Sequence, residues 1–150
     1  MKLVIGDKNW STWSLRPWLV LRRAGIPFEE VMIRLRRGDE TAAQIAALSP
    51  SGKVPALIDG DLVVWDSLAI CEYLADGYAE AALWPRDTAA RALARAATAE
   101  MHSGFQGLRN ECAMELTLRT VSEPSEAVAK DTRRIVALWR DLRDRYAKAG

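Results

Sequence analysis

The sequence predicts an α/β domain over residues 1–78 and an all-α domain over residues 86–150. Two observations predict this division. Short apolar runs alternate with segments of helical period in the first part, whereas the second part is rich in alanine and repeats its apolar residues every three or four positions. The segment 81–85 interrupts both patterns. With 150 residues, 49% of them hydrophobic, the chain can bury a core.

The first part opens with a strand, a helix and a second strand. Residues 2–5 and 28–33 are short apolar runs, and residues 14–23 have helical period. Ser14 is expected to cap this helix, and Gly25 to end it. Because a helix joins the two strands, they should be parallel with a right-handed crossover.

A second helix and a hairpin should follow. Asp39 is the expected N-cap of the helix, and Pro50 terminates it. Residues 56–58 and 62–65 read as strands on either side of an Asp-Gly pair at 59–60, which suits a tight turn. These strands should therefore be antiparallel.

A third helix should close the first part. Ser67 is its expected N-cap, and it should end near Gly77. The order β-α-β-α-β-β-α is a thioredoxin-like arrangement. In the second part, the apolar period predicts one long helix over 87–116 and another from about Ser125 to the end of the chain.

Composition excludes several classes of function. The 21 Lys and Arg against 20 Asp and Glu leave a net charge of +1, which indicates neither a nucleic-acid nor a membrane partner. Residues 1–6 are too short for a signal peptide or a membrane span, so a cytoplasmic location is expected. Cys71 and Cys112 lack CxxC spacing, and His102 is the single histidine. No redox pair and no metal centre are expected.

Four segments carry a resemblance to a known family. STWSLR at 11–16, SPSGKVP at 49–55 and WDSLAI at 65–70 resemble, in this order, the glutathione-site segments of glutathione transferases of the serine type. GFQGLRN at 104–110 is similar to the start of the second domain in the zeta class. The resemblance implies glutathione as co-substrate and a small electrophile as second substrate. Because the family's second domain has more helices than the two predicted, the chain resembles a shortened member.

The resemblance gives the catalytic role to Ser11. The residues alone favour an ordinary loop serine here, three positions before the predicted helix. In the family, such a hydroxyl donates to the glutathione thiolate, which the helix macrodipole also favours. Thr12 is the neighbouring hydroxyl and the alternative candidate to face the thiolate, and it is expected among the glutathione-binding residues.

The other glutathione contacts are expected from two segments. The resemblance implies a cis bond between Val54 and Pro55, with the Val54 backbone paired to the ligand. Lys53 would meet a ligand carboxylate or be a solvated lysine. Ser67 and the helix N–H groups suit the γ-glutamyl carboxylate. Asp66 would face the ammonium or only compensate the helix dipole.

The second-substrate pocket is expected from both parts of the chain. In the first part, Trp13 is expected to line this pocket. Met101 and Phe105 lie on the apolar stripe and equally fit a helical core. Gln106 and Asn110 are one helical turn apart, where they would present two amides to an acidic co-substrate or form an exposed polar pair.

Several functions stay open. The expected one is detoxification-type conjugation of the glutathione thiolate to small electrophiles. One alternative is a zeta-like isomerase of the maleylacetoacetate isomerase type, although Trp13 replaces the zeta-like cysteine. Another is a non-catalytic glutathione-binding or assembly module, against which Ser11 speaks. The family also implies a two-fold homodimer, since the stripe of the predicted helix 87–116 is long for one small domain to cover.

Overall fold

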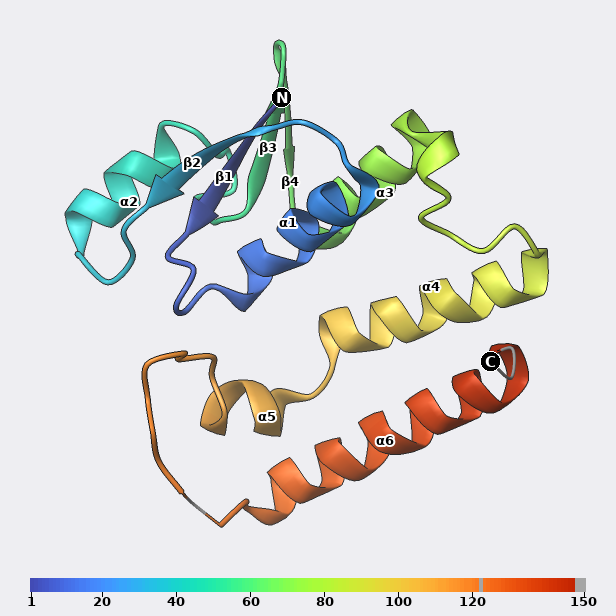
Figure 1. Cartoon of the computed structure of the whole chain (residues 1–150). Helices are drawn as coiled ribbons and strands as arrows, with labels where there is room; N and C mark the ends of the chain where they lie inside the picture. Colours follow the sequence, from blue (N-terminus) through green and yellow to red (C-terminus); the bar gives the residue numbers. More distant parts are fainter. Residues whose placement is uncertain (122, 148–150) are drawn as a thin grey trace. The chain divides into compact units, whose positions relative to one another are not determined.

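The computed structural model describes residues 1–121 and 123–147 (Figure 1). Within these ranges, no helix combines the length and the apolar character needed to cross a membrane. The chain divides into two compact units. Unit 1 comprises Met1–Leu83 with Met114–Leu116, and unit 2 comprises Trp84–Ala113 with Thr117–Gly150.

Unit 1 is built on a four-stranded sheet of order β2-β1-β3-β4. Its strands are β1 (Lys2–Gly6), β2 (Glu29–Ile33), β3 (Ala56–Asp59) and β4 (Leu62–Trp65). β1 pairs with β2 in parallel and with β3 in antiparallel, and β3 pairs antiparallel with β4. Gly60, with a φ of 60°, supplies the left-handed conformation of the tight turn between β3 and β4. The predicted pairings are confirmed.

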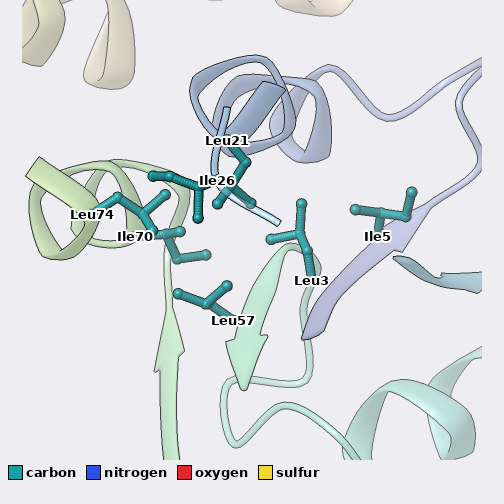
Figure 2. Close-up of a cluster of buried hydrophobic side chains, with 7 residues drawn as sticks. All are labelled: Leu3, Ile5, Leu21, Ile26, Leu57, Ile70 and Leu74. Carbon is teal, nitrogen blue, oxygen red and sulfur yellow. The ribbon is translucent and has the colours of Figure 1, made fainter. Parts of the chain in front are cut away.

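Helices cover both faces of this sheet. α1 (Thr12–Ala24) and α3 (Ser67–Gly77) pack on one face, α2 (Asp39–Ala46) packs on the other, and a short 3₁₀ turn, η1 (Ala79–Ala81), follows α3. Alternation along β1 sends Leu3 and Ile5 to the first face and Val4 to the second. Figure 2 shows the first cluster, formed by Leu3, Ile5, Leu21, Ile26, Leu57, Ile70 and Leu74. Each such side chain contributes about 1.5–3 kcal/mol by burial.

The N-caps of α2 and α3 differ from the predicted ones. α2 already includes Asp39, and Gly38 takes the cap position without a side-chain hydrogen bond. α3 likewise includes Ser67, and the cap is Asp66, whose φ is 72°. In both cases the expected cap lies in the first turn instead, because the backbone becomes helical one residue earlier than the sequence pattern suggests.

Unit 2 contains α4 (Thr88–Ser103), α5 (Gln106–Glu111) and α6 (Glu126–Tyr146). The prediction of one helix over 87–116 is wrong. The chain leaves the helix at Gly104 and passes through Phe105, whose φ is 63°. The Arg109 side chain donates to the carbonyls of Gly104, at 2.8 Å, and Met101, which stabilises the break. The prediction of a second helix from about Ser125 is confirmed by α6, which Ser125 caps. The expected extension of this helix over 148–150 lies outside the described residues.

α5 packs closely against α6. A Cβ on Gly107 would lie 2.8 Å from the carbonyl carbon of Ala127, so only glycine fits at this contact. The Leu108 N–H donates to Asp131 at 3.1 Å. The fold class predicted from the sequence, a thioredoxin-like α/β domain followed by a helical region, is confirmed.

Candidate functional site

The sheet register brings three separate segments to one edge. Val4 pairs with Ala56, and Ala56 pairs with Trp65 on its other side. Since both pairings are antiparallel, the residues after β1, before β3 and after β4 emerge at the same end of the sheet. Ser11, the 53–55 segment and the 66–67 segment therefore share this edge, although they are far apart in the sequence.

Ser11 is the N-cap of α1, a position that the sequence pattern assigned to Ser14. Its Oγ accepts the N–H of Ser14 at 3.3 Å, and its hydroxyl donates to Ser14 Oγ at 2.8 Å. Ser14 Oγ also accepts the N–H of Gly6 at 3.1 Å, so this long-range contact occupies the hydroxyl that should have capped the helix. As a result, the 8% exposed Ser11 lies at the positive end of the α1 macrodipole. Thr12, half-buried, opens the helix beside it.

The second segment carries the predicted cis bond between Val54 and Pro55. Pro55 is buried and Val54 is half-buried. Lys53 is exposed, and its backbone N–H donates to the Ser51 hydroxyl at 3.3 Å. The Lys53 side chain thus stands at the surface of the shared edge.

The third segment contains a buried hydroxyl without a partner. Ser67 is 2% exposed, and its Oγ makes no hydrogen bond within the described part of the chain. Beside it, Asp66 Oδ1 accepts the N–H groups of Leu68 at 2.8 Å and Ala69 at 3.4 Å, which fits the helix-start role weighed for Asp66. An unpaired buried hydroxyl costs about 1–3 kcal/mol, so Ser67 is suited to a ligand that would complete it.

A cavity of about 170 Å³ opens behind Ser11 in unit 1. Its lining consists of Ile5, Gly6, Lys8, Ser11, Ser14, Leu15, Trp18 and Leu116. The sequence pattern did not predict this cavity. Leu116, which is distant in the sequence, lines the cavity, and its N–H donates to the Asn9 carbonyl at 3.4 Å. A contact between residues so far apart cannot be predicted from the local sequence.

Known proteins share both the sequence and the fold. A family model described as "Glutathione S-transferase, N-terminal domain" matches residues 10–76. The solved beta class glutathione S-transferase of Sphingomonas chungbukensis is 30% identical, with a TM-score of 0.66 over 100% of this chain and 74% of that one. The chain belongs to the glutathione S-transferase family.

Two curated relatives match about two thirds of this chain. Glutathione S-transferase Z2 of Arabidopsis thaliana is 38% identical over 100 residues, which are 67% of this chain and 45% of that protein. A probable maleylacetoacetate isomerase of Caenorhabditis elegans is 30% identical over 105 residues, 70% of this chain and 48% of that protein. The chain thus spans about half the length of these relatives.

The expected second-substrate residues lie in both units. Trp13 is half-buried in unit 1 with the Arg16 guanidinium 4.1 Å from its ring centroid. In unit 2, Phe105 is 8% exposed, which fits the core alternative. The Gln106 amide donates to the Ser103 carbonyl at 3.3 Å. Asn110 is exposed and Met101 half-buried. That these residues form one pocket stays a prediction.

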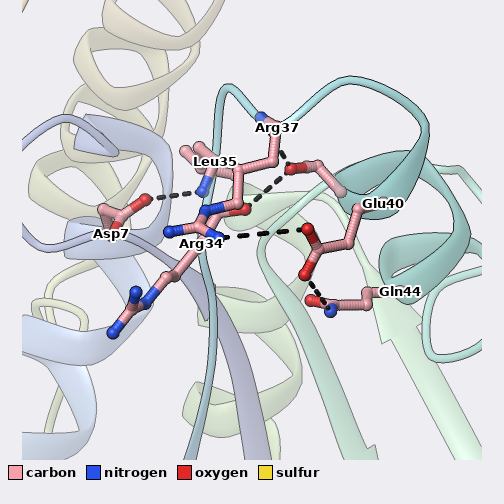
Figure 3. Close-up of polar contacts among 7 residues, drawn as sticks. Asp7, Arg34, Leu35, Arg37, Glu40 and Gln44 are labelled. Carbon is pink, nitrogen blue, oxygen red and sulfur yellow. Dashed lines mark hydrogen bonds and ion pairs between the residues drawn. The ribbon is translucent and has the colours of Figure 1, made fainter.

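A polar network joins the loop before α1 to the loop before α2 (Figure 3). Asp7 Oδ2 accepts the N–H of Leu35 at 2.6 Å. From the first turn of α2, Thr41 donates to the Arg34 carbonyl at 2.7 Å and accepts the N–H of Arg37 at 3.1 Å. Nearby, the Arg36 guanidinium lies 4.1 Å from the ring centroid of Trp10, the residue before Ser11. These contacts fix the start of the segment that carries Ser11.

Cys71, on α3, is a poor nucleophile. Burial raises the pKa of the Cys71 thiol on α3 from 9.0 to about 11. At neutral pH this thiol is protonated, and only a thiolate is strongly nucleophilic. A reactive sulfur at this edge would therefore have to come from a ligand.

Proposed function

We propose that this chain binds glutathione at the shared edge of unit 1 and conjugates its thiolate to small electrophiles. The observation that carries the proposal is Ser11, a nearly buried hydroxyl at the positive end of α1. The family membership supports glutathione as the co-substrate. A cytoplasmic location is part of the same proposal.

The residues at the edge fit glutathione. Ser67 Oγ, buried without a hydrogen-bond partner among the described residues, would donate to the γ-glutamyl carboxylate at the positive end of α3. Asp66 would face the ammonium, and the Val54 backbone would pair with the cysteinyl part. The exposed Lys53 would meet the other carboxylate of the tripeptide.

Bound glutathione supplies a thiolate that forms a C–S bond with the electrophile, whose leaving group departs with its electron pair while the thiol proton goes to solvent. Ser11 would stabilise that charge by turning its hydroxyl proton from Ser14 to the sulfur, since hydroxyl groups rotate to suit their partners. Ser14 can then donate to Ser11 in return while it still accepts the N–H of Gly6 at 3.1 Å. Such a chain of hydrogen bonds strengthens each member. Ser14 is thus a positioning residue.

A glutathione-dependent isomerase is the second candidate. The relative named a probable maleylacetoacetate isomerase supports it. In this reaction the thiol would add to a double bond of an acidic substrate and leave again. Two assays distinguish the functions. Turnover of chlorinated substrates indicates the conjugating enzyme, and turnover of unsaturated acidic substrates indicates the isomerase. Glutathione binding without either turnover indicates a module that only binds glutathione.

Substitution of Ser11 tests the proposal. Ser11→Ala should lower turnover by about 10- to 1,000-fold and change glutathione affinity little, because the hydroxyl contributes mainly to the developing charge. Thr12→Ala tests the neighbouring hydroxyl, which is the alternative candidate for this role. If Thr12→Ala alone shows the loss, the catalytic role belongs to Thr12. Full activity in both variants would contradict a catalytic role for either hydroxyl.

We also propose a two-fold homodimer, as the family implies. Light scattering on this chain and on a form extended at its C-terminus measures it directly. A compact monomer in both forms would refute the dimer.

A further inference from the structure

The connector between α5 and α6 passes back into unit 1. Residues 112–121, all of them described, form no helix or strand. Met114–Leu116 belong to unit 1, although the residues on either side of them belong to unit 2. Leu116 lines the cavity at Ser11 and is at the same time 61% exposed, so it lies where this cavity meets the surface.

The anchor of this connector in unit 1 is firm. The Leu116 N–H donates to the carbonyl of Asn9 at 3.4 Å. Asn9 lies in the loop that leads to Ser11, where the N–H groups of Trp10 and Ser11 donate to the Asp7 carbonyl at 3.1 and 2.9 Å. These bonds hold the loop, so the Asn9 carbonyl keeps its place two residues before Ser11. The hydrogen bond from Leu116 therefore ties the connector to the loop that leads to the proposed catalytic hydroxyl.

The connector itself is packed weakly. Its distance of 3.4 Å to Asn9 is long for a hydrogen bond between backbone groups. Besides Leu116, Leu118 is 53% exposed and Val121 is fully exposed. Stabilisation by burial grows with the apolar area removed from water, so these side chains do little to hold the connector in place. Segments with few buried contacts open locally at a small free-energy cost, and the loops that cover binding sites are of this kind.

We propose that residues 114–118 are a strap that opens to admit and release ligands at Ser11 and closes over a bound ligand. This inference rests on the proposed function, because Ser11 is the residue expected to face the thiolate. The hydrogen bond between Leu116 and Asn9 belongs to the closed state, and opening breaks it. A ligand beside Ser11 would cover part of the Leu116 side chain that solvent otherwise contacts, so ligand binding favours the closed state. Opening of the strap then limits how fast the ligand leaves.

Hydrogen exchange of the backbone N–H of residue 116 measures the closed state directly. S-methylglutathione, a product that cannot react further, should slow this exchange about tenfold or more in the wild type, because the N–H then stays on the Asn9 carbonyl for longer. Leu116→Ala keeps the N–H but removes the covering side chain, so the ligand should protect it much less. Leu118→Ala, on the strap at a 53% exposed position outside the described lining, is the matched control and should keep the full protection.

Binding kinetics separate a strap from an ordinary ligand contact. In stopped-flow measurements, Leu116→Ala should raise both the association and the dissociation rate constants of S-methylglutathione about fivefold or more, whereas Leu118→Ala should change neither. A rise in the dissociation rate constant alone would show that Leu116 is only a contact and would overturn the strap.

The outcomes also separate the strap from the proposed function. S-methylglutathione binding that leaves the exchange at residue 116 unchanged in the wild type would overturn the strap alone. Protection of this N–H without turnover of any electrophile would support the strap and overturn the transferase function. If S-methylglutathione does not bind, both the proposed function and the strap are overturned.

Discussion

Unit 1 and unit 2 bury their apolar residues in different ways. In unit 1 the sheet separates two clusters, and no member of the first is more than 6% exposed. In the described part of unit 2, the buried apolar residues are Phe105 and Val128, and Trp139 on α6 is 58% exposed. Local stability follows the density of buried contacts. The edge that carries Ser11 therefore lies in the unit with more buried apolar residues, which suits the thiolate site proposed above.

The same substitution in each unit should sharpen this comparison. Leu57→Ala removes a fully buried side chain from unit 1 and should lower the free energy of unfolding by about 2–5 kcal/mol. Leu138→Ala in α6 removes a half-buried one and should cost less than half as much. Urea denaturation, with hydrogen exchange to locate the loss, measures both. Equal losses would show that the two units are equally well packed.

The sequence predicts unit 1 better than unit 2 for a physical reason. Its strands and its turn at Gly60 depend on local signals: alternation and an Asp-Gly pair. The break between α4 and α5 depends on long-range contacts, because Arg109 satisfies the carbonyls there and Gly107 lets α5 approach Ala127. A helical period continues through such a break, so the pattern alone predicts one helix.

Some features of the candidate site could be predicted from the sequence, and others could not. The cis bond before Pro55 follows from the family resemblance and is present. The cap of α1 could not be predicted, because Ser14 turns its hydroxyl to the Gly6 N–H in a neighbouring strand. The cavity was also missed, since Leu116 reaches it only through the tertiary fold.

Ser67 should separate stability from binding. In Ser67→Ala the unpartnered hydroxyl is lost, so the free energy of unfolding should stay equal or rise, while the Kd for glutathione rises about 5- to 100-fold. Ser49→Ala is the matched control, because Ser49 is also 2% exposed but pairs with Ser51 at 3.0 Å. The control should lose stability and keep its affinity. Calorimetric titration and urea denaturation would contradict the assignment if both variants lost only stability.

The smallest effect concerns Glu30, whose Oε1 accepts the indole N–H of Trp18 at 2.7 Å. Hydrogen bonds from Lys8 and Trp18 lower the pKa of Glu30 from 4.5 to about 2. Because the folded state favours the ionised carboxylate, Glu30 contributes its full stabilisation at a pH above 4.5. That stabilisation is lost as the pH falls from about 4.5 to about 2. Glu30→Gln should therefore cost less than about 1 kcal/mol at neutral pH and lose less stability than the wild type on acidification. Parallel pH profiles of unfolding would contradict this role.

The pKa of the glutathione thiol in the complex tests the central claim most directly, because Ser11 and the α1 macrodipole are proposed to stabilise a thiolate. Ultraviolet absorbance of the thiolate, followed against pH, gives this value. We expect a pKa well below the ordinary thiol value of about 8.5 in the wild type, and a return toward it in Ser11→Ala. The same pKa for bound and free glutathione, or for the wild type and Ser11→Ala, would contradict the account.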